Sequence, residues 1–396
     1  MKLDDLKELS YKIEEDLKKD IEEVSDFIFN NPELGGEEYI SSKYLVDKIS
    51  EYGFKVEYPY CNIDTSFRAE FGDEEGPVIA FLSEYDALPG YNIRGGVGHA
   101  CGHNWIAAGT FGACAVLSKL KDHFKGKIVL IGTPAEESIG YKCDLVKAGA
   151  FEDIDVVFQM HIEAVNNIQV KALAMDSIEF TFKGVSAHAA SHPHMGVNAL
   201  DGVNLTFAGI NALRQHVTSD VRIHGIVCEG GQAPNIVPDK ASCKICVRAE
   251  KRENLEIVKE KVINCAKGAE LMTGAKMSYR YYENSFDNIK HNKVLQRIMK
   301  ENLIEVGIRN IHDNGDGPAG STDIGNVSQV CPTMYTELAL DEENIPRVHE
   351  EGFLNYANSK LAYDKLHQSV KAMVNSALEI YLNEALLKEI KDEHNK

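Results

Sequence analysis

The chain has 396 residues, of which 44% are hydrophobic, so it can bury cores for two domains. Its formal net charge of −19 at pH 7 argues against a nucleic-acid partner, because such binding depends on lysine and arginine side chains that neutralise phosphates. No uninterrupted apolar stretch reaches the roughly 18 residues of a transmembrane helix, so we expect no membrane partner either.

The N-terminus and the cysteines predict a cytoplasmic location. Residues 1–6 (MKLDDL) are charged and lack the apolar segment of a signal peptide. The nine cysteines have no regular spacing, which in so long a chain is typical of reduced thiols. Cys243 and Cys246 form a CxxC pair, but residues 241–249 alternate like a strand, which would place the two thiols on opposite faces. We therefore interpret this pair as structural.

The first 160 residues alternate between helical and strand patterns. Residues 3–30 predict an amphipathic helix, because leucine and isoleucine recur there at helical spacing among charged residues. Further helices are expected at residues 37–52, 105–120 and 141–149, and strands near residues 54–58, 66–71, 77–83, 127–132 and 155–160. This alternation predicts an α/β domain with a mostly parallel sheet covered by helices.

The pattern changes near residue 175. Strands are expected near residues 177–182, 221–228, 240–249 and 276–282, and helices at 196–216 and 252–272. This βαββαβ order predicts a ferredoxin-like α+β module. The β/α pattern then resumes with a helix at 291–306, a glycine-rich turn at 315–320, a strand at 333–339 and a long helix from about residue 357. We therefore predict that residues 175–285 are inserted into a domain made of residues 1–174 and 286–396.

Three groups of metal-binding residue types follow three of the predicted buried strands. Cys101 and His103 lie in a glycine-flanked segment, Glu136 and Glu137 follow the second strand, and His161 ends the third. In open α/β sheets, sites collect on loops beyond the carboxyl ends of strands, so these side chains can converge. Thiolate, imidazole and carboxylate together suit Zn²⁺, Mn²⁺ or a similar ion.

Each group also has an ordinary structural interpretation. Cys101 could be a small buried residue beside a turn, and His161 could be a core histidine. Glu136 and Glu137 could begin a solvated helix, where carboxylates are favoured. The side chains of adjacent residues point in different directions, so two functional glutamates would have different roles. One would bind an ion and the other would accept and donate a proton. The joint pattern favours the metal site.

Several motifs together resemble peptidase family M20, the metallopeptidases and amidohydrolases. They extend over nearly the whole chain in the family's order: SEYDALP at 83–89, GHACGHN at 98–104, TPAEE at 133–137, His161, GVSAHAA at 184–190, PNIVP at 234–238 and GSTD at 320–323. The chain is most similar to subfamily D, the branch with aminoacylase-1-like and p-aminobenzoyl-glutamate hydrolase proteins. Asn104 stands where the auxin-conjugate hydrolases of this branch tend to have Asp, which favours the dipeptide and p-aminobenzoyl-glutamate types.

The resemblance implies a catalytic domain, at residues 1–174 and 286–396, that binds two divalent metal ions, Zn²⁺ or Mn²⁺. It also implies that the inserted domain, residues 175–285, forms a lid and a homodimer. The implied metal ligands are Cys101, His103, Glu137, His161 and His349. The family usually has a hydroxyl residue after the last of these, where this chain has Glu350, so an exposed loop histidine remains the alternative for His349.

By the same resemblance, the chain is an amidohydrolase that cleaves the amide bond of an N-acyl, N-aminobenzoyl or aminoacyl amino acid. Glu136 would be the general base toward water activated by the ions, and His188 would stabilise the oxyanion across a dimer interface. Asn235 and Arg248 would bind the substrate, although alone they would be ordinary turn and surface residues. The alternatives are a dipeptidase or carboxypeptidase, a non-catalytic binding protein of the same fold, and a protein with structural zinc.

Overall fold

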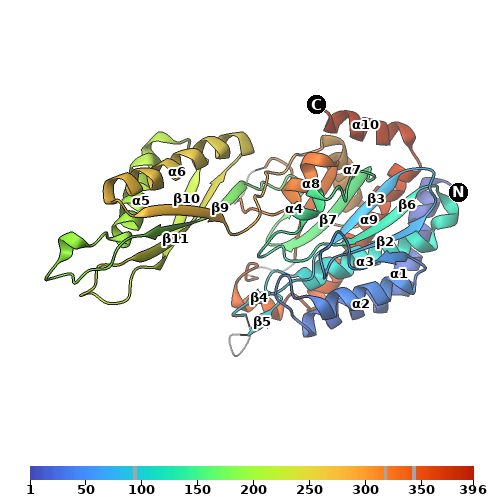
Figure 1. The fold of residues 1–396 in the computed structure, drawn as a ribbon. Coiled ribbons are helices and arrows are strands. Elements are labelled where there is room, and N and C mark those ends of the chain that lie inside the picture. Colours follow the sequence, from blue (N-terminus) through green and yellow to red (C-terminus); the bar gives the residue numbers. More distant parts are fainter. Residues whose placement is uncertain (92–95, 316–318, 341–344) are drawn as a thin grey trace. The chain divides into compact units, whose positions relative to one another are not determined.

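The computed structural model describes residues 1–91, 96–315, 319–340 and 345–396. The chain forms two compact units (Figure 1). The first unit contains Met1–Lys171, Ile289–Ala319 and Asn326–Lys396, and the second contains Ala172–Asn288 with Gly320–Gly325. Half of the predicted glycine-rich turn, residues 316–318, lies outside the described residues.

The first unit is built on an eight-stranded, mostly parallel sheet with the order β1-β2-β6-β3-β7-β14-β8-β13. Its four central strands run parallel and are largely buried, which explains their continuous apolar sequences. They are β6 (Lys127–Gly132), β3 (Val78–Ser83), β7 (Val156–Glu163) and β14 (Thr333–Ala339). The edges are β1 (Lys55–Glu57) and β2 (Phe67–Gly72) on one side, both in antiparallel pairs, and β8 (Asn166–Asn167) and β13 (Ile311–His312) on the other.

Helices cover this sheet, as the alternating pattern predicts (Figure 1). Three of them pack closely against one another: α1 (Leu3–Asn30), α3 (His103–Lys119) and α9 (Lys360–Tyr381). The others are α2 (Tyr39–Ser50), α4 (Lys142–Lys147), α7 (Lys293–Glu305) and α10 (Glu384–His394), with α8 at Ile324–Val330 and a small hairpin of β4 (Leu88–Pro89) and β5 (Val97–Gly98). The single closing helix predicted from residue 357 is wrong: α9 and α10 are separate, because Asn383 caps α10 by accepting a hydrogen bond from Leu386 N–H.

The second unit has the predicted ferredoxin-like order of elements. Its antiparallel sheet has the strand order β10-β11-β9-β12, and helices α5 and α6 pack against it and against each other. The elements are β9 (Ala174–Lys183), α5 (Ala199–Leu213), β10 (Arg222–Glu229), β11 (Lys240–Ala249), α6 (Arg252–Thr273) and β12 (Lys276–Tyr281). The predicted α/β fold with an α+β insertion is thereby confirmed.

Two smaller predictions can also be compared with the fold. Cys243 is fully buried on β11 and Cys246, on the other face, is partly exposed, so the structural interpretation of the CxxC pair is confirmed. All nine cysteines are free thiols. Among the described residues, no helix combines the length and the apolar character that a membrane span requires.

Candidate metal centre

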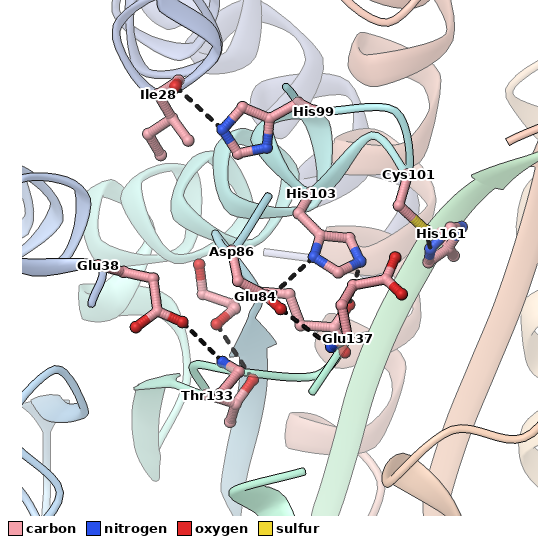
Figure 2. A network of polar contacts seen from close by, with 12 residues as sticks. Ile28, Glu38, Glu84, Asp86, His99, Cys101, His103, Thr133, Glu137 and His161 are labelled. Carbon is pink, nitrogen blue, oxygen red and sulfur yellow. Dashed lines mark hydrogen bonds and ion pairs between the residues drawn. The ribbon is translucent and has the colours of Figure 1, made fainter. Parts of the chain in front are cut away.

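Cys101 and His103 are placed by the tight turn that begins α3. The residue between them, Gly102, adopts the left-handed conformation with φ +79°. A Cβ atom at Gly102 would lie 2.3 Å from Ile162 Cγ2, so only glycine allows this approach of the turn to β7. Both Cys101 and His103 are buried, and they lie beside His161 on β7 (Figure 2).

The remaining predicted ligands come from two loops and a strand of the same unit. Glu137 follows β6, in a loop that also carries Glu136, and both are partly buried. His161 is the sixth residue of the buried strand β7. His349 belongs to a loop in which its own N–H donates to Ala100 O at 2.8 Å. Segments far apart in the sequence therefore meet at the carboxyl ends of parallel strands.

The donor atoms of these residues converge. Cys101 Sγ lies 3.4 Å from His161 Nε2 and 3.2 Å from His349 Nε2, and the latter is 2.8 Å from Glu137 Oε1. Among the described residues of the first unit, three groups have donor atoms within 4.8 Å of one another: Cys101 with His103 and His161, Cys101 with Glu137 and His349, and His103 with Glu136 and Glu137. The first two groups share the Cys101 sulfur.

This set of donors fits a divalent metal ion. His103 is fully buried, yet its Nε2 has no hydrogen-bond partner among the described residues. A buried polar atom without a partner is unfavourable, and a metal ion would satisfy it. A thiolate, imidazoles and a carboxylate within a few ångströms are the ligands that Zn²⁺ and related ions take in proteins.

Asp86 fixes the orientation of His103, and sequence reasoning assigned it no role. Its Oδ1 lies 2.8 Å from His103 Nδ1, which leaves Nε2 directed toward the other donors. Its Oδ2 accepts a hydrogen bond from the backbone N–H of Glu137 at 2.9 Å. One carboxylate thus orients an imidazole ligand and the backbone of a carboxylate ligand, the kind of support that metal-binding histidines usually have.

The carboxylates around His103 and Cys101 determine whether these two side chains are protonated. Burial lowers the pKa of His103, but the charges of Asp86 and then Glu84 outweigh it and raise the pKa to about 10. Burial, followed by the charges of Glu137 and Glu136, raises the pKa of the Cys101 thiol well above its usual range. Both groups therefore hold protons at neutral pH without an ion, and a metal ion binds there in exchange for protons.

We expect Asp86→Asn to weaken metal binding by about 10–100-fold, because an amide can accept only one of the two hydrogen bonds that the Asp86 carboxylate accepts. The test is a competition titration with a chelator that measures the dissociation constants of Zn²⁺ and Mn²⁺. Asp73→Asn is the control, since Asp73 is an exposed carboxylate that pairs with Lys121. Unchanged metal affinity in Asp86→Asn would show that His103 needs no such support.

A buried ion pair lies directly beside the site and was also missed. Glu84 follows β3, and its Oε1 is 2.5 Å from the Nζ of Lys142, a fully buried lysine on α4. Its Oε2 lies 3.6 Å from His103 Nε2. Burial raises the pKa of Glu84, but Lys142 and then His103 lower it overall, to about 2. Glu84 and Asp86 belong to the SEYDALP motif, so a sequence signal existed for them, whereas Lys142 had none.

The three other predicted residues lie in the second unit. His188 and Asn235 are exposed and adjacent: residues 188 and 236 form a β-bridge, and Ala189 N–H donates to Asn235 O at 3.0 Å. Arg248 lies elsewhere, on β11, where its Nη1 donates to Ser321 Oγ at 3.2 Å. Arg248 is partly buried and so is not the fully solvated surface arginine of the ordinary interpretation.

Comparisons with known proteins identify the family. Residues 80–376 match the model of peptidase family M20/M25/M40. The chain is 33% identical over 386 residues to the Xaa-Arg dipeptidase of Mus musculus, covering 93% of this chain and 88% of that protein. It is 27% identical over 440 residues to one of the subunits of p-aminobenzoyl-glutamate hydrolase from Escherichia coli (94% and 91%).

A solved structure agrees with these matches. The fold is similar to that of a dinuclear metal-binding peptidase of family M20 from Bacillus subtilis, with a TM-score of 0.69, 20% identity and coverage of 92% and 99%. The resemblance seen in the motifs is confirmed, and so is the use of divalent metal. The chain belongs to peptidase family M20/M25/M40 and is a metal-dependent hydrolase of carbon–nitrogen amide bonds.

Proposed function

We propose that this chain cleaves the amide bond between an aminoacyl, acyl or aminobenzoyl group and an amino acid, and that dipeptides are its main substrates. The observation that carries the proposal is the position of Glu136, whose carboxylate lies within 4.8 Å of the donor atoms of His103 and Glu137. The names of the two relatives, a dipeptidase and a component of a p-aminobenzoyl-glutamate hydrolase, support small amide substrates.

We infer that two ions, Zn²⁺ or Mn²⁺, are held by the five donors Cys101, His103, Glu137, His161 and His349. Two groups of three donors that share Cys101 support a pair of ions, and so does the similarity to a dinuclear metal-binding peptidase. When bound, such ions lower the pKa of water and polarise the amide carbonyl.

The residues would divide the reaction between them. Glu136 takes a proton from the attacking water and passes it to the amide nitrogen as the C–N bond breaks, so proton and leaving group balance. His188 donates a hydrogen bond to the oxyanion that forms on the carbonyl oxygen. Asn235 and Arg248 bind the substrate, and the Arg248 guanidinium suits its free carboxylate.

We also propose that residues 1–174 and 286–396 carry the catalytic centre and that residues 175–285 form a homodimer, in the cytoplasm. The strand β10 lies at the edge of its sheet, and Ile226 and Val227 on it are 64% and 49% exposed. Soluble proteins seldom leave such an edge uncovered, so a second copy of the chain is a suitable partner.

The function is tested with a substrate panel on the protein loaded with Zn²⁺ or Mn²⁺. The panel contains dipeptides with basic, acidic and apolar C-terminal residues, p-aminobenzoyl-glutamate and N-acetyl amino acids. We expect the highest kcat/KM on a dipeptide. Turnover of N-acetyl amino acids alone would make the protein an aminoacylase, and no turnover of any member would contradict the proposal.

We expect His188→Ala to lower kcat by roughly 10²–10³-fold without loss of metal, because it removes one donor to the oxyanion. Kinetics and metal analysis on the same sample measure both effects. Ala substitution of the exposed His216 is the control.

Mixed dimers test whether His188 acts across the dimer. After exchange of protomers between His188→Ala and Glu136→Gln proteins, hybrid dimers would restore at most about a quarter of the wild-type sites. Activity no higher than that of either variant, with the exchange demonstrated by mass spectrometry, would contradict a site shared between protomers.

A further inference from the structure

The loop that carries Glu136 depends on an unusual backbone conformation at the preceding residue. Ala135 has φ +59°, in the left-handed region that residues with a Cβ atom rarely adopt. It is fully buried, and its carbonyl accepts hydrogen bonds from Ser138 N–H and Gly140 N–H at 3.4 and 2.8 Å. Such a conformation persists only where the surroundings hold it.

A buried carboxylate from a distant segment contacts this backbone directly. Glu38, which is labelled in Figure 2, precedes α2 and is fully buried. Its Oε1 accepts a hydrogen bond from Ala135 N–H at 2.7 Å. Its Oε2 accepts from Gly36 N–H at 2.9 Å and from Thr65 Oγ1 at 3.0 Å. Three donors from three segments thus fix the carboxylate, which in turn fixes the backbone at Ala135.

Glu38 and Asp86 together hold the backbone on both sides of Glu136. Glu38 accepts the N–H of the residue before Glu136, and Asp86 accepts the N–H of the residue after it, Glu137. Asp86 also contacts the imidazole of His103, whereas no hydrogen bond or ion pair joins Glu38 to a metal donor among the described residues. Glu38 therefore acts on the Glu136 loop without being part of the donor set.

The packing of the Glu38 segment supports the same conclusion. A Cβ atom at Gly35 would lie 2.3 Å from Ser138 Oγ and 2.9 Å from Ala135 Cα, so this segment lies directly against the loop. Ala87 N–H donates to Glu33 O at 2.8 Å, which joins the same segment to the backbone next to Asp86. The segment 33–38 is thus a common support for both carboxylates.

We propose that Glu38 is a positioning residue for catalysis: by holding Ala135 in its left-handed conformation, it sets the place of the Glu136 carboxylate. This inference rests on the proposed role of Glu136 as general base. Displacement of a catalytic group by about 1 Å can cost roughly 10²-fold in rate, so the loss of this support has a measurable effect on kcat.

The test compares Glu38→Gln with Thr65→Val in the metal-loaded dimer. Glutamine keeps the shape but replaces one acceptor oxygen with an NH₂ donor, so either Ala135 N–H or Gly36 N–H loses its acceptor. We expect kcat to fall about 10–100-fold on the best substrate of the panel, with KM within about twofold and full metal content. Thr65→Val removes one hydrogen bond to Glu38 and keeps that to Ala135, so its kcat stays near the wild-type value.

A second substitution separates positioning from folding. Glycine adopts positive φ without strain, so Ala135→Gly introduced into Glu38→Gln should recover part of the lost kcat. Hydrogen–deuterium exchange gives a readout without substrate: peptides over residues 133–140 should exchange faster in Glu38→Gln than in Thr65→Val. If Glu38→Gln does not fold, Glu38→Asp, which shortens the side chain by one methylene, takes its place with the same expectations.

Three outcomes would overturn the inference: wild-type kcat in Glu38→Gln, a loss of kcat that metal loss accounts for, or no recovery with Ala135→Gly. Failure of the proposed function is distinguishable from these. If Glu136→Gln remains fully active, Glu136 is not the base. If Glu136→Gln is inactive and Glu38→Gln is normal, only the positioning role is wrong.

Discussion

Glu136→Gln is expected to lower kcat by about 10²–10⁴-fold, the usual contribution of a general base, while metal content stays at the wild-type level. Glutamine keeps the size and the hydrogen-bonding geometry of the side chain but cannot take the proton of the attacking water. Glu136 lies within reach of His103 and Glu137 donor atoms, so it can act on water at the metal site. Steady-state kinetics and elemental analysis of one sample measure both quantities.

The control for Glu136→Gln is Glu152→Gln, which changes an exposed carboxylate in the turn before β7 and should leave kcat unchanged. If Glu136→Gln loses metal together with activity, then Glu136 is a ligand and the roles of Glu136 and Glu137 are exchanged. The structure favours Glu137 as the ligand, because its Oε1 lies 2.8 Å from His349 Nε2.

Cys101→Ala is expected to leave no measurable turnover at metal concentrations that saturate the wild-type protein. Its sulfur belongs to two groups of donor atoms, one with His103 and His161 and one with Glu137 and His349, so its loss removes a ligand from both. Metal content should fall with activity, since a thiolate is a strong ligand for Zn²⁺ and related ions. Cys114→Ala is the matched control. Like Cys101, Cys114 is a buried free thiol, but it lies within α3 and belongs to the hydrophobic core. Full metal content with a normal rate in Cys101→Ala would show that Cys101 is a small buried residue and not a metal ligand.

Much of the fold was predictable because its signals are local. The apolar segments of β3, β6 and β7 are continuous because these strands are buried in a parallel sheet. The alternation in β9 and β11 reflects strands with one buried face, and the order of elements then indicated two kinds of domain. The end of α9 was missed, because a helix stop at Leu382 and a new cap at Asn383 leave little trace in an amphipathic pattern.

The residue types of the metal donors could also be predicted from the sequence. A thiol, imidazoles and carboxylates that follow three strands seldom occur together except at a metal site. Their supports were not, because hydrogen bonds between distant segments leave no periodic signal. Asn104 shows the difference. Its neighbour His103 faces the donors, whereas Asn104 Nδ2 donates to Ser25 Oγ and Ala357 O, between α1 and the segment before α9.

The sequence by itself determined most of the longer helices and strands, the order of the two folds and the residue types of the metal site, because each depends on the local spacing of residues. Only the tertiary structure decided that Asp86 orients His103, that Lys142 pairs with Glu84 and that Glu38 holds Ala135. In each case a charged or strained group would be unfavourable alone and is stabilised by a partner at least 17 residues away. Such partners are chosen by the packing of the chain, which no single segment contains.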